Sequence, residues 1–588
     1  MPKVTADVIS RCLISGLATL LVSKPSSAQV SQAAAPSAGL RGMSFPAQLN
    51  PELPYDVDVD ALRRLSITPD KPAPPYDIAA ANLPAAQRLF DVFSWQAFIA
   101  LNWPASANGQ PDKSKTLADA SALRVWEYFV DAALVYQQDG AAPLPWSQAV
   151  KATQQQRVFW MHGMGLGTPP ADPKKKGGFR RPLFLNESLQ AFTGPMVDQA
   201  GRWVRYQAAL NSVEFDYLVA NKLYNLDGQA AFTASRKIEF PANAGTRSYG
   251  SMEIKTSWKQ LAASDDAARF FVRRAKVARL DGSTFDAEFG LVGMHITART
   301  QSSPTWIWAT FEHIDNTAVN DLERDGKERP LQPSFFNPSL PAKPVNVLSP
   351  KNSMPVRQYD SYTGKDTGPA VFTSWDESKT TAPTQTLMVL PVPKATAALN
   401  REVQTLLAQA GSVFKNYELI GSQWPAQPEF PAFPNGVATQ SDGRLLPAST
   451  ESIVFKVPGK IVPVFLVNTT METFFQNGNQ VAGPVAADDR LPPGEVADPS
   501  TIFATESCTG CHFSAGACIG FKRDVNGRYV VEARNGKNYR IPVFGQNASR
   551  GLTGNADYSW LLQIRAQSAP YDGTDTVPLD DVLIVQSK

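Results

Sequence analysis

Cysteine and histidine are scarce in this chain, with four of each among 588 residues. Cys12 lies in an N-terminal stretch that we expect to be removed, which leaves Cys508, Cys511 and Cys518. An odd number of cysteines cannot close a disulfide framework, so the fold must be stabilised by its hydrophobic core. At about 150 residues per domain, a chain of this length is expected to form three to four domains.

Strong net charge and long apolar runs are also missing. Residues 1–28 combine Lys3 and Arg11, an apolar run over 12–22 and small residues at 26–28, a pattern typical of a cleaved secretory signal peptide. Without them, 53 basic side chains balance 53 acidic ones, so no nucleic-acid surface is expected. The apolar run is about half of the ~20 residues that cross a bilayer, and no later run is long enough, so no membrane span is expected.

The run Cys508-Thr509-Gly510-Cys511-His512 places two thiols three residues apart, with a histidine directly after the second. Cys-x-x-Cys-His is the attachment signature of c-type haem, in which each thiol forms a thioether with a vinyl group and the histidine reaches the iron. The motif therefore predicts one covalent haem c held by Cys508 and Cys511, with His512 as proximal iron ligand. Because c-type haem is attached outside the bacterial cytoplasm, the N-terminal pattern and the motif both indicate a periplasmic protein.

The same residues allow a second interpretation, a zinc or iron–sulfur site. Cys508, Cys511, His512 and Cys518 supply three thiolates and an imidazole, which suit a tetrahedral metal. This interpretation leaves the histidine directly after the second cysteine unexplained. Cys518 falls outside the haem attachment spacing, and we expect it to be a buried residue that the haem does not need.

Four regions are expected along the chain: the signal peptide (1–28), an extended lead-in rich in Pro and Ala (29–83), a large region of one or two α+β domains (84–495), and a haem-binding segment (496–588). In the large region, apolar periodicity predicts helices at 89–102, 122–136 and 396–410. Alternating patterns predict strands at 252–258, 270–279, 288–299, 305–314, 417–421, 452–457 and 461–467.

On the Cys508–His512 motif and the aromatic-rich stretch 557–567, residues 496–570 resemble the small cytochrome c fold. The resemblance implies one helix at 499–507 leading into the motif and a second at 557–567 packed against it. Turns at Asn526-Gly527 and Asn535-Gly536 predict inserted hairpin strands that the small fold lacks. The expected fold is therefore α+β, with a large β-rich mixed domain followed by a small, mainly helical cytochrome c-like haem segment with an inserted hairpin.

The whole chain is also similar to long single-haem bacterial proteins of the cytochrome c family. The similarity is carried by runs at 93–96, 294–313 and 468–473, and it implies no particular substrate. A small electron-carrying cytochrome takes its sixth iron ligand from a methionine downstream of the motif, but neither Met nor His follows His512. The distal side of the haem is therefore expected to come from the preceding region.

The distal candidates are His295, His313 and Met471. The two histidines lie on an expected hairpin, in which side chains alternate between faces and paired residues share a face. An even sum of paired residue numbers places His295 and His313 on one face, with Trp308 on the other; an odd sum separates the histidines. Met471 is the second choice, since a methionine in such a place more often fills a core.

Three functions remain open. The protein could pass single electrons to a periplasmic redox partner, with Met471 or a histidine as the sixth ligand. It could be a haem-dependent oxidoreductase, for example peroxidase-like, in which His295 or His313 serves as acid or base toward a small-molecule substrate. The long region before residue 496 slightly favours the enzyme, since a simple carrier does not need it. The third is a haem sensor or binding protein without turnover.

Overall fold

The computed structural model describes residues 45–155, 158–164, 194–279, 282–319, 333–337, 339–340, 345–347, 374–379, 381–430, 458–463, 465–476, 507–513, 515–534, 536–545 and 555–573. The signal peptide, the strand expected at 452–457 and residues 499–506 of the expected helix lie outside the described residues. Residues 45–588 cluster into one compact unit. The boundaries proposed at 83 and 495 stay predictions.

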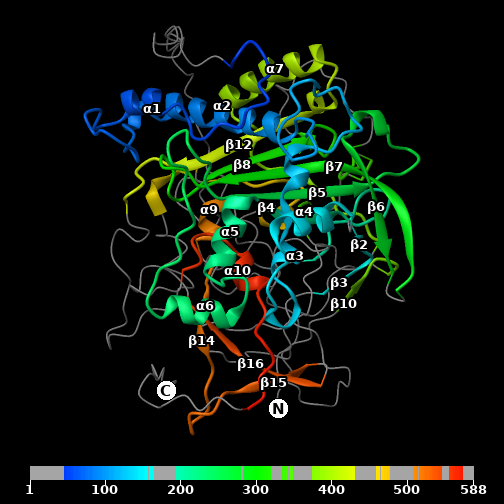
Figure 1. Cartoon of the computed structure of the whole chain (residues 1–588). Helices are drawn as coiled ribbons and strands as arrows, with labels where there is room; N and C mark the ends of the chain where they lie inside the picture. Colours follow the sequence, from blue (N-terminus) through cyan, green and yellow to red (C-terminus); the bar gives the residue numbers. More distant parts are fainter. Residues whose placement is uncertain are drawn as a thin grey trace, which may run out of the picture. The chain divides into compact units, whose positions relative to one another are not determined.

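A nine-stranded sheet, antiparallel except where β2 pairs with β6, lies at the centre of the fold (Figure 1). Its main path is β1-β4-β5-β7-β8-β12-β13, and β6 pairs with both β7 and β2. The strands are β1 (Val130–Asp131), β2 (Val158–Trp160), β4 (Arg205–Leu210), β5 (Met252–Gln260), β6 (Val272–Ala278), β7 (Thr284–Ala298), β8 (Ile307–His313), β12 (Tyr417–Pro425) and β13 (Ile461–Val462). This large antiparallel sheet with separate helices confirms the α+β class.

Two long helices cover one face of the sheet. They are α2 (Leu83–Leu101) and α7 (Lys394–Gln409), close to the helices predicted from aromatic and apolar spacing. Both contact β12, and α2 also contacts β7, β8 and the short α1 (Val59–Leu65). Phe98 of α2 stacks on Phe311 of β8, with ring centroids 4.3 Å apart. Helix α1, capped by Asp58, shows that the described part of the expected extended lead-in is partly helical.

The helix predicted at 122–136 is wrong. Its place is taken by a 3-10 turn (Val125–Tyr128), strand β1 and the one-turn helix α3 (Ala132–Val135). Val130 pairs with Leu210 of β4, and Asp131 accepts a hydrogen bond from the Ala133 amide, which starts a new helix. Pairing with a distant strand and a local cap therefore override the helical spacing of the apolar residues.

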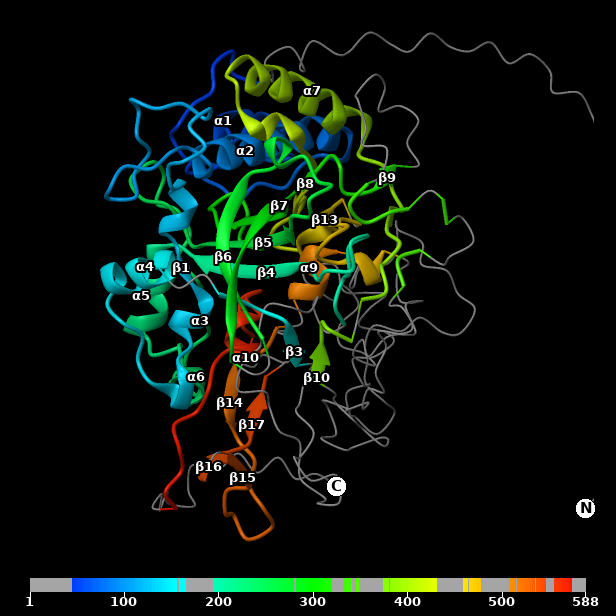
Figure 2. The ribbon, with the colours of Figure 1, turned by 90° about the vertical axis from the view of Figure 1, so that its right-hand side faces the viewer.

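The remaining helices are α4 (Trp146–Gln155), α5 (Ser212–Ala220), α6 (Leu226–Thr233), α9 (Cys508–His512) and α10 (Leu561–Ile564). The views in Figure 1 and Figure 2 place α1, α2 and α7 on one side of the sheet and α9 and α10 on the other.

Small two-stranded sheets form from β3 (His162–Met164) with β10 (Ser374–Asp376) and from β9 (Ala318–Val319) with β11 (Leu387–Met388). No helix in the described part of the chain could cross a membrane.

Beyond residue 506 the described residues form two short helices and two small sheets. Strand β14 (Cys518–Phe521) pairs with β17 (Pro542–Phe544), and β15 (Val531–Arg534) forms a hairpin with β16 (Lys537–Arg540). Gly527 and Gly536 have positive φ, as the two predicted turns require. Helix α10 is shorter than expected because Asp557 and Tyr558 have positive φ, which a right-handed helix excludes.

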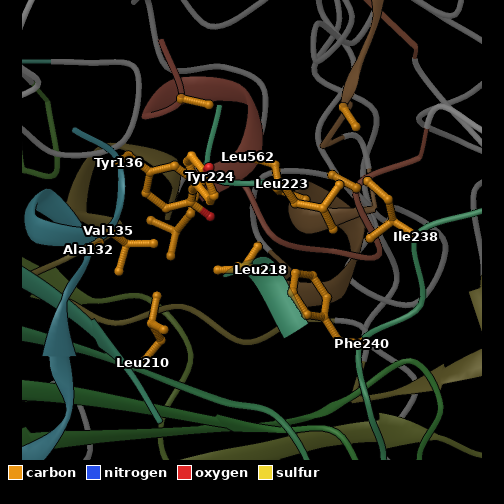
Figure 3. Packing of buried hydrophobic residues seen from close by; sticks show 14 of the residues in the cluster. Ala132, Val135, Tyr136, Leu210, Leu218, Leu223, Tyr224, Ile238, Phe240 and Leu562 are labelled. Atoms are coloured by element: carbon orange, nitrogen blue, oxygen red, sulfur yellow. The ribbon is translucent and has the colours of Figure 1, made fainter. Parts of the chain in front are cut away.

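These C-terminal residues share a hydrophobic core with the preceding region. Figure 3 shows Leu562 among Leu218, Leu223, Tyr224 and Ile238. The same cluster contains Phe513, Cys518 and Tyr558 together with Trp306 and Trp308 of the sheet region. The segment after residue 506 therefore folds against the large region rather than around a core of its own.

Candidate functional site

Helix α9 carries the Cys-x-x-Cys-His motif and is attached to the sheet through Gln423 of β12. The Thr509 amide donates to Gln423 Oε1 at 2.8 Å, and Gln423 Nε2 donates to Ser507 Oγ at 2.9 Å. Ser507 caps the helix, since its Oγ accepts from the Gly510 amide. The five-residue helix places Cys508 and Cys511 on one turn, with His512 at its end.

The His512 ring is held in one orientation by a backbone carbonyl. Its Nδ1 donates to the Tyr558 oxygen at 2.7 Å, so Nε2 carries the lone pair that can bind a metal. The ring also lies against Trp308 of β8, with centroids 4.5 Å apart. Burial lowers the pKa of His512 to about 4. The imidazole is therefore neutral at pH 7, the form that coordinates metals.

Cys508 faces apolar side chains. It packs against a cluster formed by Met388, Val392, Ile420 and Leu466. Burial raises the pKa of the Cys508 thiol well above its usual value, with a further contribution from Glu472. Two thiols on one turn, an apolar wall and an oriented neutral histidine fit a covalently attached haem, whose macrocycle is largely apolar.

The tetrahedral-metal interpretation lacks a convergent set of ligands. Among the described residues no three His, Cys, Asp or Glu side chains come together as metal ligands. Cys518 is fully buried, with its Sγ 3.1 Å from the Gly520 oxygen and its amide donating to Gln229 of α6. Cys508, Cys511 and Cys518 form no disulfide.

The register of β7 and β8 separates the two candidate histidines. His295 pairs with Thr310 and Gly293 with Glu312, so the paired residue numbers have an odd sum. His295 and His313 therefore lie on opposite faces of the sheet, and Trp308 shares the face of His295. The common pocket wall that the even register would give does not form. Because Trp308 contacts His512, the face of His295 is the one that meets α9.

His295 belongs to a buried polar cluster beside the motif. Its Nε2 lies 3.4 Å from Glu472 Oε2, and Lys255 is its cross-strand partner on β5. Burial alone would raise the pKa of Glu472, but His295 and Lys255 lower it overall. Besides burial, Lys255 and His295 contribute to the lowered pKa of His512. The cluster lies on the face of the sheet that Trp308 shares and that meets His512.

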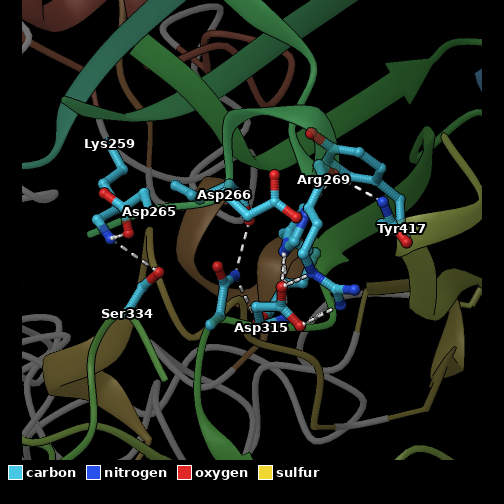
Figure 4. A network of polar contacts seen from close by, with 12 residues as sticks. Lys259, Asp265, Asp266, Arg269, Asp315, Ser334 and Tyr417 are labelled. Atoms are coloured by element: carbon cyan, nitrogen blue, oxygen red, sulfur yellow. Dashed lines mark hydrogen bonds and ion pairs between the residues drawn. The ribbon is translucent and has the colours of Figure 1, made fainter. Parts of the chain in front are cut away.

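His313 has a different environment on the other face. The Asp315 amide donates to its Nδ1 at 3.1 Å, and its Nε2 donates to the Arg269 oxygen at 2.9 Å. Figure 4 shows Arg269 reaching Asp315, which closes this network. The His313 ring also stacks on Phe270 at 4.1 Å. Both ring nitrogens are engaged, so neither is placed to bind iron in this arrangement.

Met471 is fully buried in an apolar cluster that contains none of the motif residues. Its neighbours are Met196, Val204, Tyr206, Phe270, Val292 and Phe335. This is the core-filling environment that competes with iron ligation for a methionine. Of the three distal candidates, His295 alone lies in a cluster that influences the pKa of His512.

Several residues around the motif carry no signal of their own in the sequence. The Tyr558 carbonyl is contributed by the backbone, 46 residues after His512. Lys255 has no motif around it in the sequence, and only the register of β5 with β7 shows that it lies opposite His295. Glu472 lies in the run 468–473 that supports the family resemblance, and its pairing with His295 depends on the fold.

Comparisons of the chain with protein-family models, with curated proteins and with solved structures found no match. The resemblance to c-type cytochromes therefore stays a prediction from the motif.

Proposed function

We propose that this protein is a periplasmic monohaem c-type cytochrome, with haem c attached to Cys508 and Cys511 and His512 as the proximal iron ligand. The hydrogen bond from His512 Nδ1 to the Tyr558 carbonyl is the main support, because it leaves Nε2 for the metal in a fixed direction. When bound, the haem supplies one-electron redox chemistry.

The chain's own residues would keep this site dry and orient its ligand. Trp308 limits rotation of the His512 ring, and Gln423 fixes the turn that carries both thiols. Apolar side chains around Cys508 exclude water, which lets nearby charges act strongly. A redox function fits such a site, since the potential of an iron centre depends on ligand, burial and nearby charge.

His295 is the distal residue that we propose, paired with Glu472. If His295 binds the iron, the protein is an electron carrier that passes electrons to a redox partner. If the site is open, an imidazole 3.4 Å from a carboxylate can take up and deliver protons, as a peroxidase-like oxidoreductase requires of its acid or base. The second function is favoured by this pairing, because the carboxylate of Glu472 holds the imidazole in one orientation, as an acid or base group requires.

Haem staining after denaturing electrophoresis tests the attachment. The full chain, expressed with a cytochrome c maturation system, should give a stained band, and the Cys508→Ala/Cys511→Ala double variant should lose it. Cys518→Ser is the matched control and should keep the stain. An unstained wild-type band in correctly exported protein would refute the proposal.

Absorption spectra with and without cyanide or carbon monoxide then separate the two functions. A spectrum that resists both ligands and changes in His295→Ala indicates an electron carrier. Rapid binding of either ligand to the wild type indicates an open site. His313→Ala is the control, since its ring nitrogens are bound on the other face; the His295 assignment is wrong if only this control alters the iron spectrum.

A further inference from the structure

The carbonyl that orients His512 belongs to an unusual stretch of backbone. Asp557 and Tyr558 are consecutive non-glycine residues with φ of 49° and 73°. The left-handed region is unfavourable for such residues, so it persists only where surrounding contacts impose it. The Tyr558 oxygen is the acceptor for His512 Nδ1. The strained residues are thus those that face the proposed iron ligand.

Contacts with the large region hold Asp557 in place. The Trp306 indole donates to the Asp557 carbonyl at 3.1 Å, and the Phe240 amide donates to its carboxylate at 2.7 Å. Arg299, the residue after β7, forms an ion pair with the same carboxylate, and both side chains are largely buried. Within the segment itself, the Asp557 amide donates to Asn555 Oδ1 at 2.7 Å.

Ser559 anchors the other side of Tyr558. Its hydroxyl donates to Glu253 Oε1 of β5 at 2.5 Å. Glu253 is partly buried next to Glu214 of α5, and burial raises the pKa of both carboxyl groups. Tyr558 therefore lies between two residues whose side chains are fixed to the sheet region, one by an ion pair and one by a hydrogen bond.

We propose that Arg299, Trp306 and Glu253 are positioning residues for His512. They impose the left-handed conformation of residues 557–558, aim the Tyr558 carbonyl at Nδ1, and so set the direction and strength of that hydrogen bond. This inference rests on the proposed function. A hydrogen bond at Nδ1 makes the imidazole a stronger donor to iron, which favours the oxidised state. Weakening the contacts that Arg299, Trp306 and Glu253 make with residues 557–559, here called the clamp, should raise the midpoint potential.

The test uses the full-length haem-loaded protein and a redox titration followed by its absorption spectrum. Arg299→Gln removes the ion pair, and Ser559→Ala removes the hydrogen bond to Glu253. Both variants should keep the haem stain and shift the midpoint potential upward. Arg299→Lys retains the charge and should recover part of the shift. Ser559→Ala is the smaller change, so it remains informative if Arg299→Gln fails to fold.

Arg205→Gln is the matched control. Arg205 also forms a buried ion pair, with Glu377, outside the clamp. It should lower stability without moving the potential, whereas a merely structural role for Arg299 would make the two variants alike. An unchanged potential in both Arg299→Gln and Ser559→Ala, with haem retained, overturns the clamp. Absence of haem in the wild type would instead refute the proposed function.

Discussion

The two faces of the central sheet bury different kinds of side chain. Toward α2 and α7, the sheet buries apolar residues such as Ile296, Ala309 and Phe311, and Phe311 contacts Trp95 and Phe98 of α2. Toward α9, charged or strongly polar residues occupy neighbouring positions of four strands. His295, Glu312 and Gln423 are buried there, and Glu253 and Lys255 are partly buried. One face is a conventional core, and the other faces the motif.

The difference indicates where the fold accepts an energetic cost. Burying an ionisable group is unfavourable unless it is paired or hydrogen-bonded. On the α2 face, polar groups complete the fold: the Trp95 indole, for example, donates to Asn400 of α7 at 2.9 Å. On the α9 face, His295 pairs with Glu472, and Glu253 accepts a hydrogen bond from Ser559, the residue after the Tyr558 that binds His512. Buried ionisable groups with shifted pKa values also occur on the α2 face, at Asp91 and His313, so the α9 face is distinguished by its position beside the motif.

The strongest test of this comparison separates the motif from its face of the sheet. Residues 496–588 expressed alone should not give a stable haem protein, because they lose Trp308 beside His512 and the large region's part of the shared core. Circular dichroism and the haem spectrum would measure the loss. A stable six-coordinate haem protein from this fragment would show that the α9 face does not build the site.

A large effect confined to stability is expected on the opposite face. Phe98 is fully buried and stacks on Phe311. Phe98→Ala should lower the free energy of unfolding by about 3–5 kcal/mol, the usual cost of such a cavity. Urea denaturation measures this loss. The spectrum of the folded, haem-loaded variant should be unchanged, and an altered iron spectrum would contradict the division of roles between the faces.

Much of the framework could be predicted because it depends on local pattern. The apolar spacing of α2 and α7 and the alternation in β5–β8 are visible in the sequence. The side-chain arrangement of the site is not, since one step of register decides whether His295 faces His313. Bulges between Ser257 and Trp258 and between Leu419 and Gly421 shift the pairing further, and they arise from packing rather than from a turn motif.

His313 provides a test of its structural role through pH. Burial lowers its pKa from 6.5 to about 4. The unfolded chain therefore binds a proton before the folded one does, so stability present above pH 6.5 is lost as the pH falls toward 4. The loss is about 3 kcal/mol at ~1.4 kcal/mol per pKa unit. In His313→Gln, the unfolding free energy measured from pH 8 to 4 should lack this loss. If wild type and variant showed the same pH dependence, His313 would lie in a more solvated environment.

Glu312, next to His313 but on the α9 face, should respond in the opposite direction. Burial raises its pKa from 4.5 to about 7, although hydrogen bonds from Thr469 favour the charged form. The folded state holds its proton longer, so stability present below pH 4.5 is lost as the pH rises through 7. The free energy of unfolding of the wild type, relative to that of Glu312→Gln, should therefore fall by up to about 3 kcal/mol between pH 4.5 and 7. If the contributions of Glu312 and His313 to the unfolding free energy changed in the same direction with pH, the environments assigned to the two residues would be wrong.

The smallest effect is expected at Cys518, which lies near the motif but outside the site. Its side chain is enclosed by the shared core, and its backbone is fixed to α6 through Gln229 and Thr233. Cys518→Ser preserves the volume and lets a hydroxyl donate to the Gly520 carbonyl in place of the thiol. It should cost about 1 kcal/mol, for a hydroxyl in an apolar setting with one partner retained, and leave the haem content unchanged. Calorimetry and the haem-to-protein ratio measure the two quantities. Loss of haem in this variant, with the fold intact, would mean that Cys518 belongs to a metal site with Cys508, Cys511 and His512. The site on the α9 face would then include strand β14.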